Sequence, residues 1–516
     1  MRLVDYLDKG AMLGADAPCL TMGAADLSYA EVQRISHRVG RALQAAGIQP
    51  GDKVAVLSSN DATGFACVFG ISRAGGVWCP VNPRNEAAEN RFVLDAFDCA
   101  CLIFHSAYAP MVEQMRAGLP KVRVLVCLDQ SWPSAPSLVQ WLEGVSAEPL
   151  QVDVTDDLLM IAGTGGTTGS PKGVMLSGRN LETMSALTLM GYPFDGRPTY
   201  LALAPLTHAA GVLTFPVMAL GGRVVIMPKP DLGEFLALIE RHRVTHTFLP
   251  PTLIYMLLQH EKLATTKLGS LQCFWYGAAP ISAARLEEAL VKIGPVMAQL
   301  FGQTEAPMMI SMMAPRDHFN ADGSVARERL SSAGRPGPLV QVATMNTEGV
   351  LLPTGETGEI VIRSSLVMMG YYKDAAATAE AGRFGWHHTG DIGRLDADGF
   401  LYIVDRAKDM IITGGFNVYS VEVEQALMQH PDVQDSAVIG LPDDKWGEKV
   451  VAVLQVHAGR SVDPHEIQAF VKARIGSVKT PKLVEIWPDL PRSKVGKVMK
   501  KDIRAQMLKR APKAPA

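Results

Sequence analysis

The chain has 516 residues, of which 48% are hydrophobic and 20% charged, and this composition excludes an intrinsically disordered protein. A formal net charge of -3, without an early block of like charges, argues against a nucleic-acid-binding protein. No apolar run approaches the roughly 18 residues of a membrane span, and the first 14 residues hold too short an apolar run for a signal peptide, so a cytoplasmic protein without a membrane span is expected.

The seven cysteines indicate reduced thiols. No pair shows CxxC spacing, and the count is odd. Most lie in apolar surroundings such as FACVFG and LQCFWY, so packing in the core is their expected role. Such a set fits a reducing compartment like the cytoplasm.

Helical and strand patterns alternate through the first 280 residues. Helices are expected at 27–48 and 62–76, and buried strands at 53–59, 101–106 and 122–128. Further strand and helix units cover 198–228 and 245–280. Strands that alternate with helices are typical of parallel sheets built from βαβ units, which makes the fold class α/β.

The pattern changes after residue 330. Residues 334–365 are rich in turns with short β runs, which predicts a small antiparallel barrel or sheet. Residues 421–456 read as helix, strand, turn and strand, which predicts a compact α+β domain. We therefore expect a large N-terminal domain over 1–405, a hinge at 406–408 and a small C-terminal domain over 409–516.

The C-terminal end is basic. From Lys479 to Ala516 there are eleven lysine and arginine residues against three acidic ones. A solvated surface is the ordinary explanation for such a tail, and an anionic ligand is the alternative.

A glycine-rich segment, MIAGTGGTTGSPKGVML, spans 160–176 between two apolar runs. The pattern predicts a strand, a loop and a second strand. Glycine allows backbone N–H groups to converge on an anion, and the loop adds threonine hydroxyls and the ammonium group of Lys172. It is not a Walker loop, because Pro171 precedes the lysine and Gly173 follows it. The alternative interpretation, a polar hairpin turn that binds no ligand, is not excluded by these residues alone.

TGGTTGSPKGV resembles the phosphate loop of the adenylate-forming superfamily, which includes acyl-CoA synthetases. Six further segments occur in the order and at the places typical of that family: YGAAP (276–280), FGQTE (301–305), GRP (334–336), WHHTGD (386–391), DRAKDMIITGGFNV (405–418) and LPRSKVGK (490–497). The chain departs from the usual pattern at Gly165, where a serine is common, at Gly178, where many relatives have histidine, and at Phe301, where most have tyrosine.

The resemblance implies that ATP, Mg²⁺ and coenzyme A are used to convert a carboxylic acid, through an acyl-AMP, into a thioester. It assigns catalysis to Lys497, Thr304, Glu305 and Lys172, with Glu305 also holding the metal. Nucleotide contacts are implied for Thr164, Gly165, Gly166, Thr167, Thr168, Gly169, Ala278, Ala279, Gln299, Phe301, Gly302, Asp391 and Arg406. The hinge is placed at Lys408, and a channel for the CoA arm at Gly414 and Gly415.

The resemblance also places the acid beside the segment PLTHAAG and the strand that carries YGAAP. The implied pocket residues are His208, Ala209, Gly211, Trp275, Gly277 and Met308. They are small or apolar apart from the histidine, and they offer no cation for a second carboxylate, so we expect an uncharged aromatic, cyclic, branched or medium-chain acid.

Three functions remain to be distinguished. The first is an acid:CoA ligase that releases AMP and pyrophosphate. The second is a ligase that loads a separate carrier protein. The third is a non-catalytic nucleotide-binding relative, which is expected to have lost Lys497 or Glu305, yet both are present. The sequence predicts no nucleic-acid partner and leaves a homodimer open.

Overall fold

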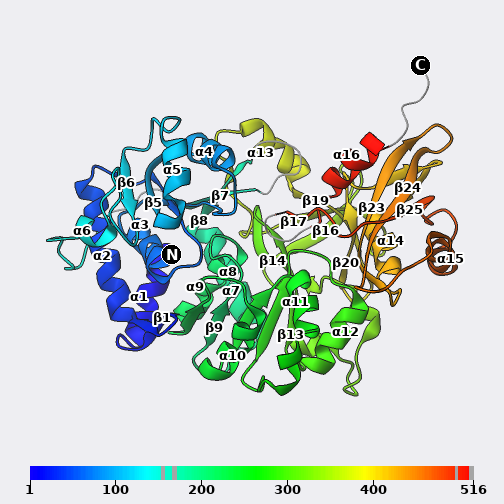
Figure 1. The fold of residues 1–516 in the computed structure, drawn as a ribbon, viewed down its shortest axis with the longest axis horizontal. Coiled ribbons are helices and arrows are strands. Elements are labelled where there is room, and N and C mark those ends of the chain that lie inside the picture. The colour runs from blue at the N-terminus through cyan, green and yellow to red at the C-terminus, as the bar shows by residue number, and fades with distance from the viewer. Residues whose placement is uncertain (153–156, 165–170, 494–497, 511–516) are drawn as a thin grey trace.

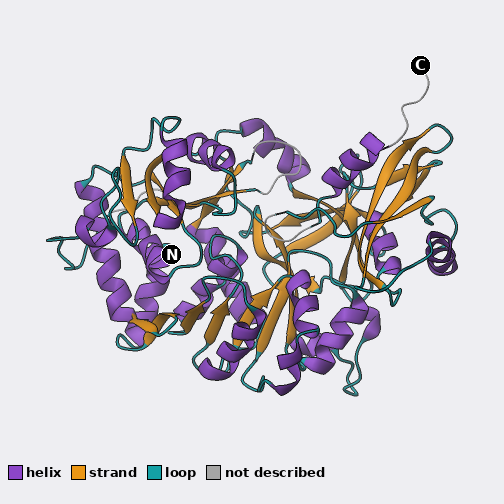
Figure 2. Cartoon of the chain, in the orientation of Figure 1, coloured by secondary structure: helices purple, strands orange, loops and turns teal. Residues whose placement is uncertain are grey.

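The structure is a computed structural model, and it describes residues 1–152, 157–164, 171–493 and 498–510. Figure 1 shows the N-terminal two thirds of the chain on one side and the C-terminal strands and helices on the other. Figure 2 shows helices covering the faces of the sheets in the N-terminal part. The arrangement confirms the predicted α/β class with a C-terminal α+β unit.

The largest sheet contains the predicted parallel strands from 198–228 and 245–280. Neighbouring strands β10, β9, β11, β12 and β13 run parallel, and β14 turns back antiparallel to β13. In spatial order the strands are β15 (Arg335–Pro336), β14 (Ala306–Met313), β13 (Met297–Gln303), β12 (Cys273–Gly277), β11 (His246–Leu249), β9 (Thr199–Ala202), β10 (Arg223–Ile226), β1 (Pro18–Met22) and β2 (Ala25–Ser28).

The second sheet is built mainly from the first 180 residues. Its central strands are parallel, whereas β8 pairs antiparallel with both β7 and β18. In spatial order the strands are β18 (Gly370–Tyr371), β8 (Gly173–Ser177), β7 (Leu158–Gly163), β4 (Val77–Pro80), β3 (Lys53–Leu57), β5 (Cys99–Phe104) and β6 (Val124–Cys127). The two strands predicted on either side of the glycine-rich segment are therefore β7 and β8.

Helix α2 begins where the sequence supplies a cap. Ser28 accepts a hydrogen bond from the N–H of Glu31, whose carboxylate accepts from the N–H of Ser28, and this capping box starts α2. The helices of the N-terminal part are α1 (Leu3–Leu13), α2 (Tyr29–Ala45), α3 (Ala62–Arg73), α4 (Ala87–Ala96), α5 (Ala109–Arg116), α6 (Leu138–Trp141), α7 (Gly178–Gly191), α8 (Ala209–Val212), α9 (Thr214–Ala219), α10 (Leu232–His242), α11 (Pro251–Leu258), α12 (Ala283–Lys292) and α13 (Ala375–Ala381).

Four strands between residues 341 and 406 form an antiparallel sheet, and the predicted barrel is not confirmed. The strands follow the order β16 (Gln341–Met345), β17 (Gly358–Arg363), β19 (His387–Leu395) and β20 (Leu401–Arg406). A barrel needs pairing between the first and last strands, and among the described residues β16 and β20 do not pair.

The C-terminal part has its own sheet and core. The chain leaves one sheet at Arg406 and enters the next at Ile411, and the residues that follow have a hydrophobic cluster of their own. The elements are β21 (Ile411–Thr413), β22 (Phe416–Val418), α14 (Ser420–Leu427), β23 (Val433–Asp443), β24 (Gly447–Val456), α15 (Pro464–Ile475), β25 (Leu483–Ile486) and α16 (Lys500–Arg510).

The N-terminal sheets share one hydrophobic core. Buried residues of both sheets, such as Val54 and Val224, belong to the same cluster as the helices between them, and all seven cysteines are buried thiols. Within the described ranges no helix combines the length and apolarity that crossing a bilayer requires.

Candidate active site

Several predicted site residues lie at or near one edge of the largest sheet. Strands β9, β11, β12 and β13 are parallel, so their carboxyl ends lie at the same edge. The segments that follow three of these strands are 207–209, 277–279 and 302–305. Ligands in α/β sheets bind outside the carboxyl ends of the strands, which makes this edge the candidate site.

A tight hairpin between β13 and β14 presents the side chains of Thr304 and Glu305. Gln303 pairs with Ala306, and the two residues between them form the turn. A Cβ at position 302 would lie 2.4 Å from the backbone N of Met308, and Met308 itself has φ +65°. Glycine at position 302 is therefore required by the hairpin, and strain of this kind is often concentrated at functional sites.

Tyr371 connects this hairpin to the glycine-rich segment. Its hydroxyl donates a hydrogen bond of 2.8 Å to Oε1 of Glu305, and Nζ of Lys172 lies 4.7 Å from the centre of its ring. Burial, with Glu305 as a second cause, raises the pKa of Tyr371 and keeps the hydroxyl a donor. Sequence reasoning missed Tyr371, because its position follows from pairing between β18 and the distant β8.

Thr164 and Lys172 hold the two ends of the glycine-rich segment together. The N–H of Thr164 donates to the carbonyl of Lys172 at 3.0 Å, and the N–H of Lys172 donates to Oγ1 of Thr164 at 3.2 Å. Five predicted loop residues and the predicted catalytic lysine lie outside the described residues: Gly165, Gly166, Thr167, Thr168, Gly169 and Lys497.

Asp391 and Arg406 form an ion pair across β19 and β20. Nε of Arg406 lies 2.7 Å from Oδ1 of Asp391, whose side chain is buried while that of Arg406 is half exposed. Gln303 donates from Nε2 to the carbonyl of Thr389 at 3.4 Å, which joins this strand to the β13–β14 hairpin. The pair predicted for the ribose is therefore connected to the turn that carries Glu305.

The predicted acid-pocket residues do not all reach the surface. His208 is exposed and begins α8, with its Nδ1 2.9 Å from Oγ1 of Thr207, and Ala209 and Met308 are half-buried. Trp275 instead lies in the core, packed against the rings of Tyr192, Phe194, Tyr200 and His246. Trp275 is therefore buried and not exposed at the surface, and its predicted place in the acid pocket stays a prediction.

Gly211 and Gly277 are required by backbone packing. A Cβ at Gly211 would lie 1.8 Å from the carbonyl oxygen of Leu206, and one at Gly277 would lie 2.3 Å from that of Leu300. Their lack of a side chain is thus not evidence of pocket depth. A valine at position 277 would disturb the sheet before it altered acid preference.

The residues predicted to contact the adenine lie on β13 or directly after β12. Phe301 and Gln299 are half-buried on β13, and Ala278, with φ +66°, and Ala279 follow β12. The Oε1 atom of Gln299 is buried without a hydrogen-bond partner among the described residues.

Gly414 and Gly415 form the turn between β21 and β22. Their φ values are +57° and +81°, and Thr413 pairs with Phe416 on either side. Two successive positive φ angles are what a tight hairpin turn of this type needs. The geometry of the turn therefore accounts for both glycines. Their part in a CoA channel stays a prediction. The hinge at Lys408, an exposed residue, likewise stays a prediction.

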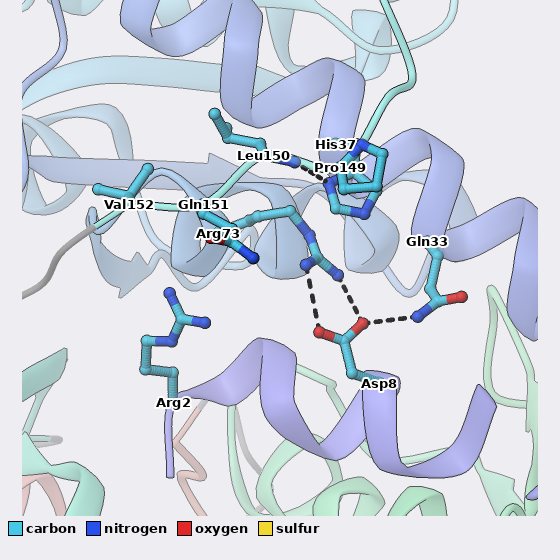
Figure 3. A pocket seen from close by; sticks show the side chains of 9 residues that line it. All are labelled: Arg2, Asp8, Gln33, His37, Arg73, Pro149, Leu150, Gln151 and Val152. Carbon is cyan, nitrogen blue, oxygen red and sulfur yellow. Dashed lines mark hydrogen bonds and ion pairs between the residues drawn. The ribbon is translucent and has the colours of Figure 1, made fainter. Parts of the chain in front are cut away.

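A cavity of about 480 Å³ lies away from this edge, between α1, α2 and α3 (Figure 3). Asp8 binds Arg73 at 2.7 Å and accepts from Gln33, so these charges are paired within the protein. His37 accepts from the N–H of Leu150, and burial lowers its pKa to about 4. This cavity shares no residue with the candidate site.

Glu305 fits the metal predicted from sequence. Mg²⁺ is commonly bound by one or two carboxylates together with substrate phosphates. No group of three or more potential metal-binding side chains occurs in the described part of the chain, so a metal held by the protein alone is not indicated there. The single carboxylate beside Lys172 and Tyr371 suits a metal carried in with a phosphate group.

Replacing Tyr371 with phenylalanine tests the orientation of Glu305. We expect the Mg²⁺ concentration for half-maximal activity to rise about tenfold, as is typical when a residue that orients a metal ligand is lost. The control is Tyr372→Phe, which removes a hydroxyl bound at 2.7 Å to Asp98 instead. Equal Mg²⁺ requirements in the two variants would contradict the role of Tyr371.

Asp391→Ala tests the predicted ribose contact. The KM for ATP is expected to rise at least about tenfold, because one hydrogen bond to a charged group contributes about 1.5–3 kcal/mol. The KM for the acid should change little. Asp396→Ala is a matched control, since this carboxylate caps the turn of the same hairpin. A larger effect on the acid than on ATP would refute the assignment.

Comparison with known proteins identifies two matching families. Residues 7–372 match the family described as AMP-binding enzyme, and residues 422–497 match the AMP-binding enzyme C-terminal domain. The chain is 36% identical to the medium/long-chain-fatty-acid–CoA ligase FadD8 of Mycobacterium tuberculosis, over 96% of this chain and 88% of that protein. It is 34% identical to feruloyl-CoA synthase of an Amycolatopsis species, over 96% and 97% of the two chains.

A solved structure extends the comparison to three dimensions. ATP-bound MatB from Rhodopseudomonas palustris aligns with a TM-score of 0.88 at 28% identity, and the alignment covers 97% of this chain and 98% of that one. The shared fold therefore includes both the N-terminal sheets and the C-terminal part.

Proposed function

Because the chain belongs to the AMP-binding enzyme family and is an AMP-forming acyl-CoA synthetase, we propose that it joins an uncharged carboxylic acid to coenzyme A. The observation that supports the proposal is that Tyr371 contacts both Glu305 and Lys172, while Gln303 links the same hairpin to the strand that carries the Asp391–Arg406 ion pair.

The first half-reaction forms the acyl-adenylate. A carboxylate oxygen of the acid bonds to the α-phosphorus of ATP, the bond from that phosphorus to the bridging oxygen breaks, and pyrophosphate leaves. Lys172 and the loop that follows Thr164 would neutralise the outer phosphates. Mg²⁺, held by Glu305, would supply further positive charge, and Thr304 would donate to the α-phosphate.

The nucleoside would lie along β13 and β19. Asp391 would accept from the ribose hydroxyls, Arg406 would complete these contacts, and Phe301 would stack on the adenine. Gln299, Ala278, Ala279 and Gly302 would border the base. The buried carboxylate of Asp391 supports this placement, because its ion pair with Arg406 holds it in position.

The second half-reaction transfers the acyl group. The thiolate sulfur of the acceptor bonds to the acyl carbon, the bond from that carbon to the phosphate oxygen breaks, and AMP leaves. We propose that rotation at Lys408 withdraws Lys497 and brings Gly414 and Gly415 to the site. Coenzyme A is the acceptor we favour, and a carrier protein with the same pantetheine arm is the alternative.

The acid is proposed to be uncharged apart from its carboxylate. The three segments 207–209, 277–279 and 302–308 contain no lysine or arginine that could pair with a second carboxylate. Ala209, Ala278, Ala279 and Met308 offer apolar contacts, and His208 adds an exposed polar side chain. Such a lining fits aromatic, cyclic, branched or medium-chain acids.

A panel of free acids tests the proposal. Each acid is incubated with ATP and Mg²⁺ and with coenzyme A, a phosphopantetheinyl carrier protein, or no acceptor, and AMP and pyrophosphate are measured. We expect acid-dependent release of both products, fastest with coenzyme A and an uncharged acid. Preference for a dicarboxylic acid would refute the substrate class, and preference for the carrier protein would refute the acceptor.

A further inference from the structure

Asn60 follows β3 of the second sheet. All the hydrogen bonds that the structure records for its side chain join it to segments that leave the largest sheet. Nδ2 donates to the carbonyl oxygens of Leu203, Ala204 and Met227 at 3.3, 3.1 and 3.1 Å. Oδ1 accepts from the N–H of Leu206 at 2.8 Å. One amide therefore ties the end of β3 to the chain that leaves β9 and β10.

The segment held by Asn60 leads directly to the acid face. The N–H of His208 donates to the carbonyl of Pro205 at 3.0 Å, and that of Gly211 donates to the carbonyl of His208 at 2.9 Å. The carbonyl of Leu206 packs against Gly211 so closely that no Cβ could fit between them. Residues 205–211 thus form one compact unit, and a shift at 206 must move His208.

The packing of protein atoms around residues 205–211 is incomplete on one side. A cavity of about 30 Å³ lies between β3, α3 and the loop, and its lining includes Leu206, Thr207 and Trp78. This cavity is partly open to solvent, so on that side the segment contacts fewer protein atoms than it would in a closed core. Hydrogen bonds to a rigid neighbour can supply the missing restraint, and those of Asn60 span 143 to 167 residues of sequence.

We propose that Asn60 is a positioning residue for acid activation, which holds His208 and Ala209 at the acid face through the segment 203–206. This inference rests on the proposed function, because it assigns His208 and Ala209 to the acid. Asn60 itself does not touch the reacting atoms. Its amide is suited to the task, since it offers two donor hydrogens and one acceptor in a plane.

Two substitutions separate hydrogen bonding from packing. Asn60→Asp keeps the size and the acceptor for Leu206 but presents a carboxylate to three carbonyl oxygens, and Asn60→Ala removes all four bonds. We expect both to raise the KM for the acid about tenfold or more, as small misplacements of a binding group can. The KM for ATP should stay within about twofold of the wild type, because the nucleotide contacts lie on other strands.

The matched control is Asn90→Ala on α4. Asn90 is fully buried and its Nδ2 donates to the carbonyl of Asn82 at 3.1 Å, so its loss removes a structural hydrogen bond of the second sheet. We expect this variant to unfold at a lower temperature with both KM values unchanged. If Asn60→Ala behaves in the same way, Asn60 is structural and the inference fails.

A second readout does not depend on catalysis. Hydrogen exchange of the backbone amides in 203–212 is expected to become faster in both Asn60 variants and to remain as in the wild type in Asn90→Ala. Unchanged exchange in this segment would overturn the inference. If the wild type releases no pyrophosphate with any acid, the proposed function fails instead, and the exchange experiment still decides whether Asn60 holds the segment.

Discussion

Replacing Lys497 with alanine is expected to slow acyl-adenylate formation by about 10²–10³-fold, the usual cost of losing one group that stabilises charge in a transition state. When the carboxylate meets the α-phosphate, two anions approach and negative charge accumulates between them. The resemblance places the Lys497 ammonium group at this position, and no other group has been assigned to bridge both reactants.

The two half-reactions distinguish this role from a general loss of structure. Acid-dependent exchange of pyrophosphate into ATP reports the first half, and conversion of supplied acyl-AMP to thioester reports the second. The Lys497→Ala variant should lose the first and retain the second. Lys501→Ala is the matched control, because Lys501 is exposed and lies in the same basic segment. Equal loss of both half-reactions in Lys497→Ala would refute the division of roles.

The local motifs that hold the proposed site residues could be recognised in the sequence. The glycines, threonines and Lys172 of one loop indicate an anion by their chemistry alone, whereas the roles proposed for Glu305 and Asp391 come from the resemblance of their segments to the family. The structure adds how these segments meet, through Tyr371 and Gln303. Tyr371 and Asn60 escaped prediction because their roles arise from contacts with segments far along the chain, which no local pattern records.

The burial of Trp275 could not be predicted, because every residue of its strand is apolar. In a parallel sheet covered by helices on both faces, a strand reads as a continuous apolar run, and CFWY at 273–276 gives no sign of which side chains meet the core. The predicted barrel is not confirmed for a related reason. Short strands and turns predict an antiparallel sheet, but its closure depends on pairing between its first and last strands.

A buried charge cluster joins the two parts of the chain beside the predicted hinge. Nζ of Lys500 lies 2.8 Å from Oε1 of Glu424 and 2.5 Å from Oγ of Ser420, which in turn donates to Oδ1 of Asp405 at 2.9 Å. Asp405 ends the N-terminal part, whereas the other three belong to the C-terminal part. Burial raises the pKa of Asp405, and it raises that of Glu424 to about 7, while the charge of Lys500 opposes both changes.

Lys500→Met is expected to lower the free energy of unfolding of the C-terminal part by about 3–5 kcal/mol, the usual cost of breaking a buried ion pair by removing one partner. The remaining carboxylates would then bind protons more tightly in the folded state than in the unfolded state. Stability that depends on a raised carboxyl pKa is present at low pH and is lost as the pH rises through that pKa. The defect should therefore be larger at pH 8 than at pH 5.5, values that lie on either side of the Glu424 pKa of about 7.

Urea-induced unfolding, followed through hydrogen exchange in β23 and β24, measures this difference at the two pH values. Adding Glu424→Gln to Lys500→Met should restore part of the stability and reduce its dependence on pH, because one of the two uncompensated carboxylates is removed. Lys501→Met serves as the control, since an exposed lysine is expected to change stability by no more than about 0.5 kcal/mol. A Lys500→Met protein as stable as this control at pH 8 would show that the cluster does not hold the C-terminal part in place.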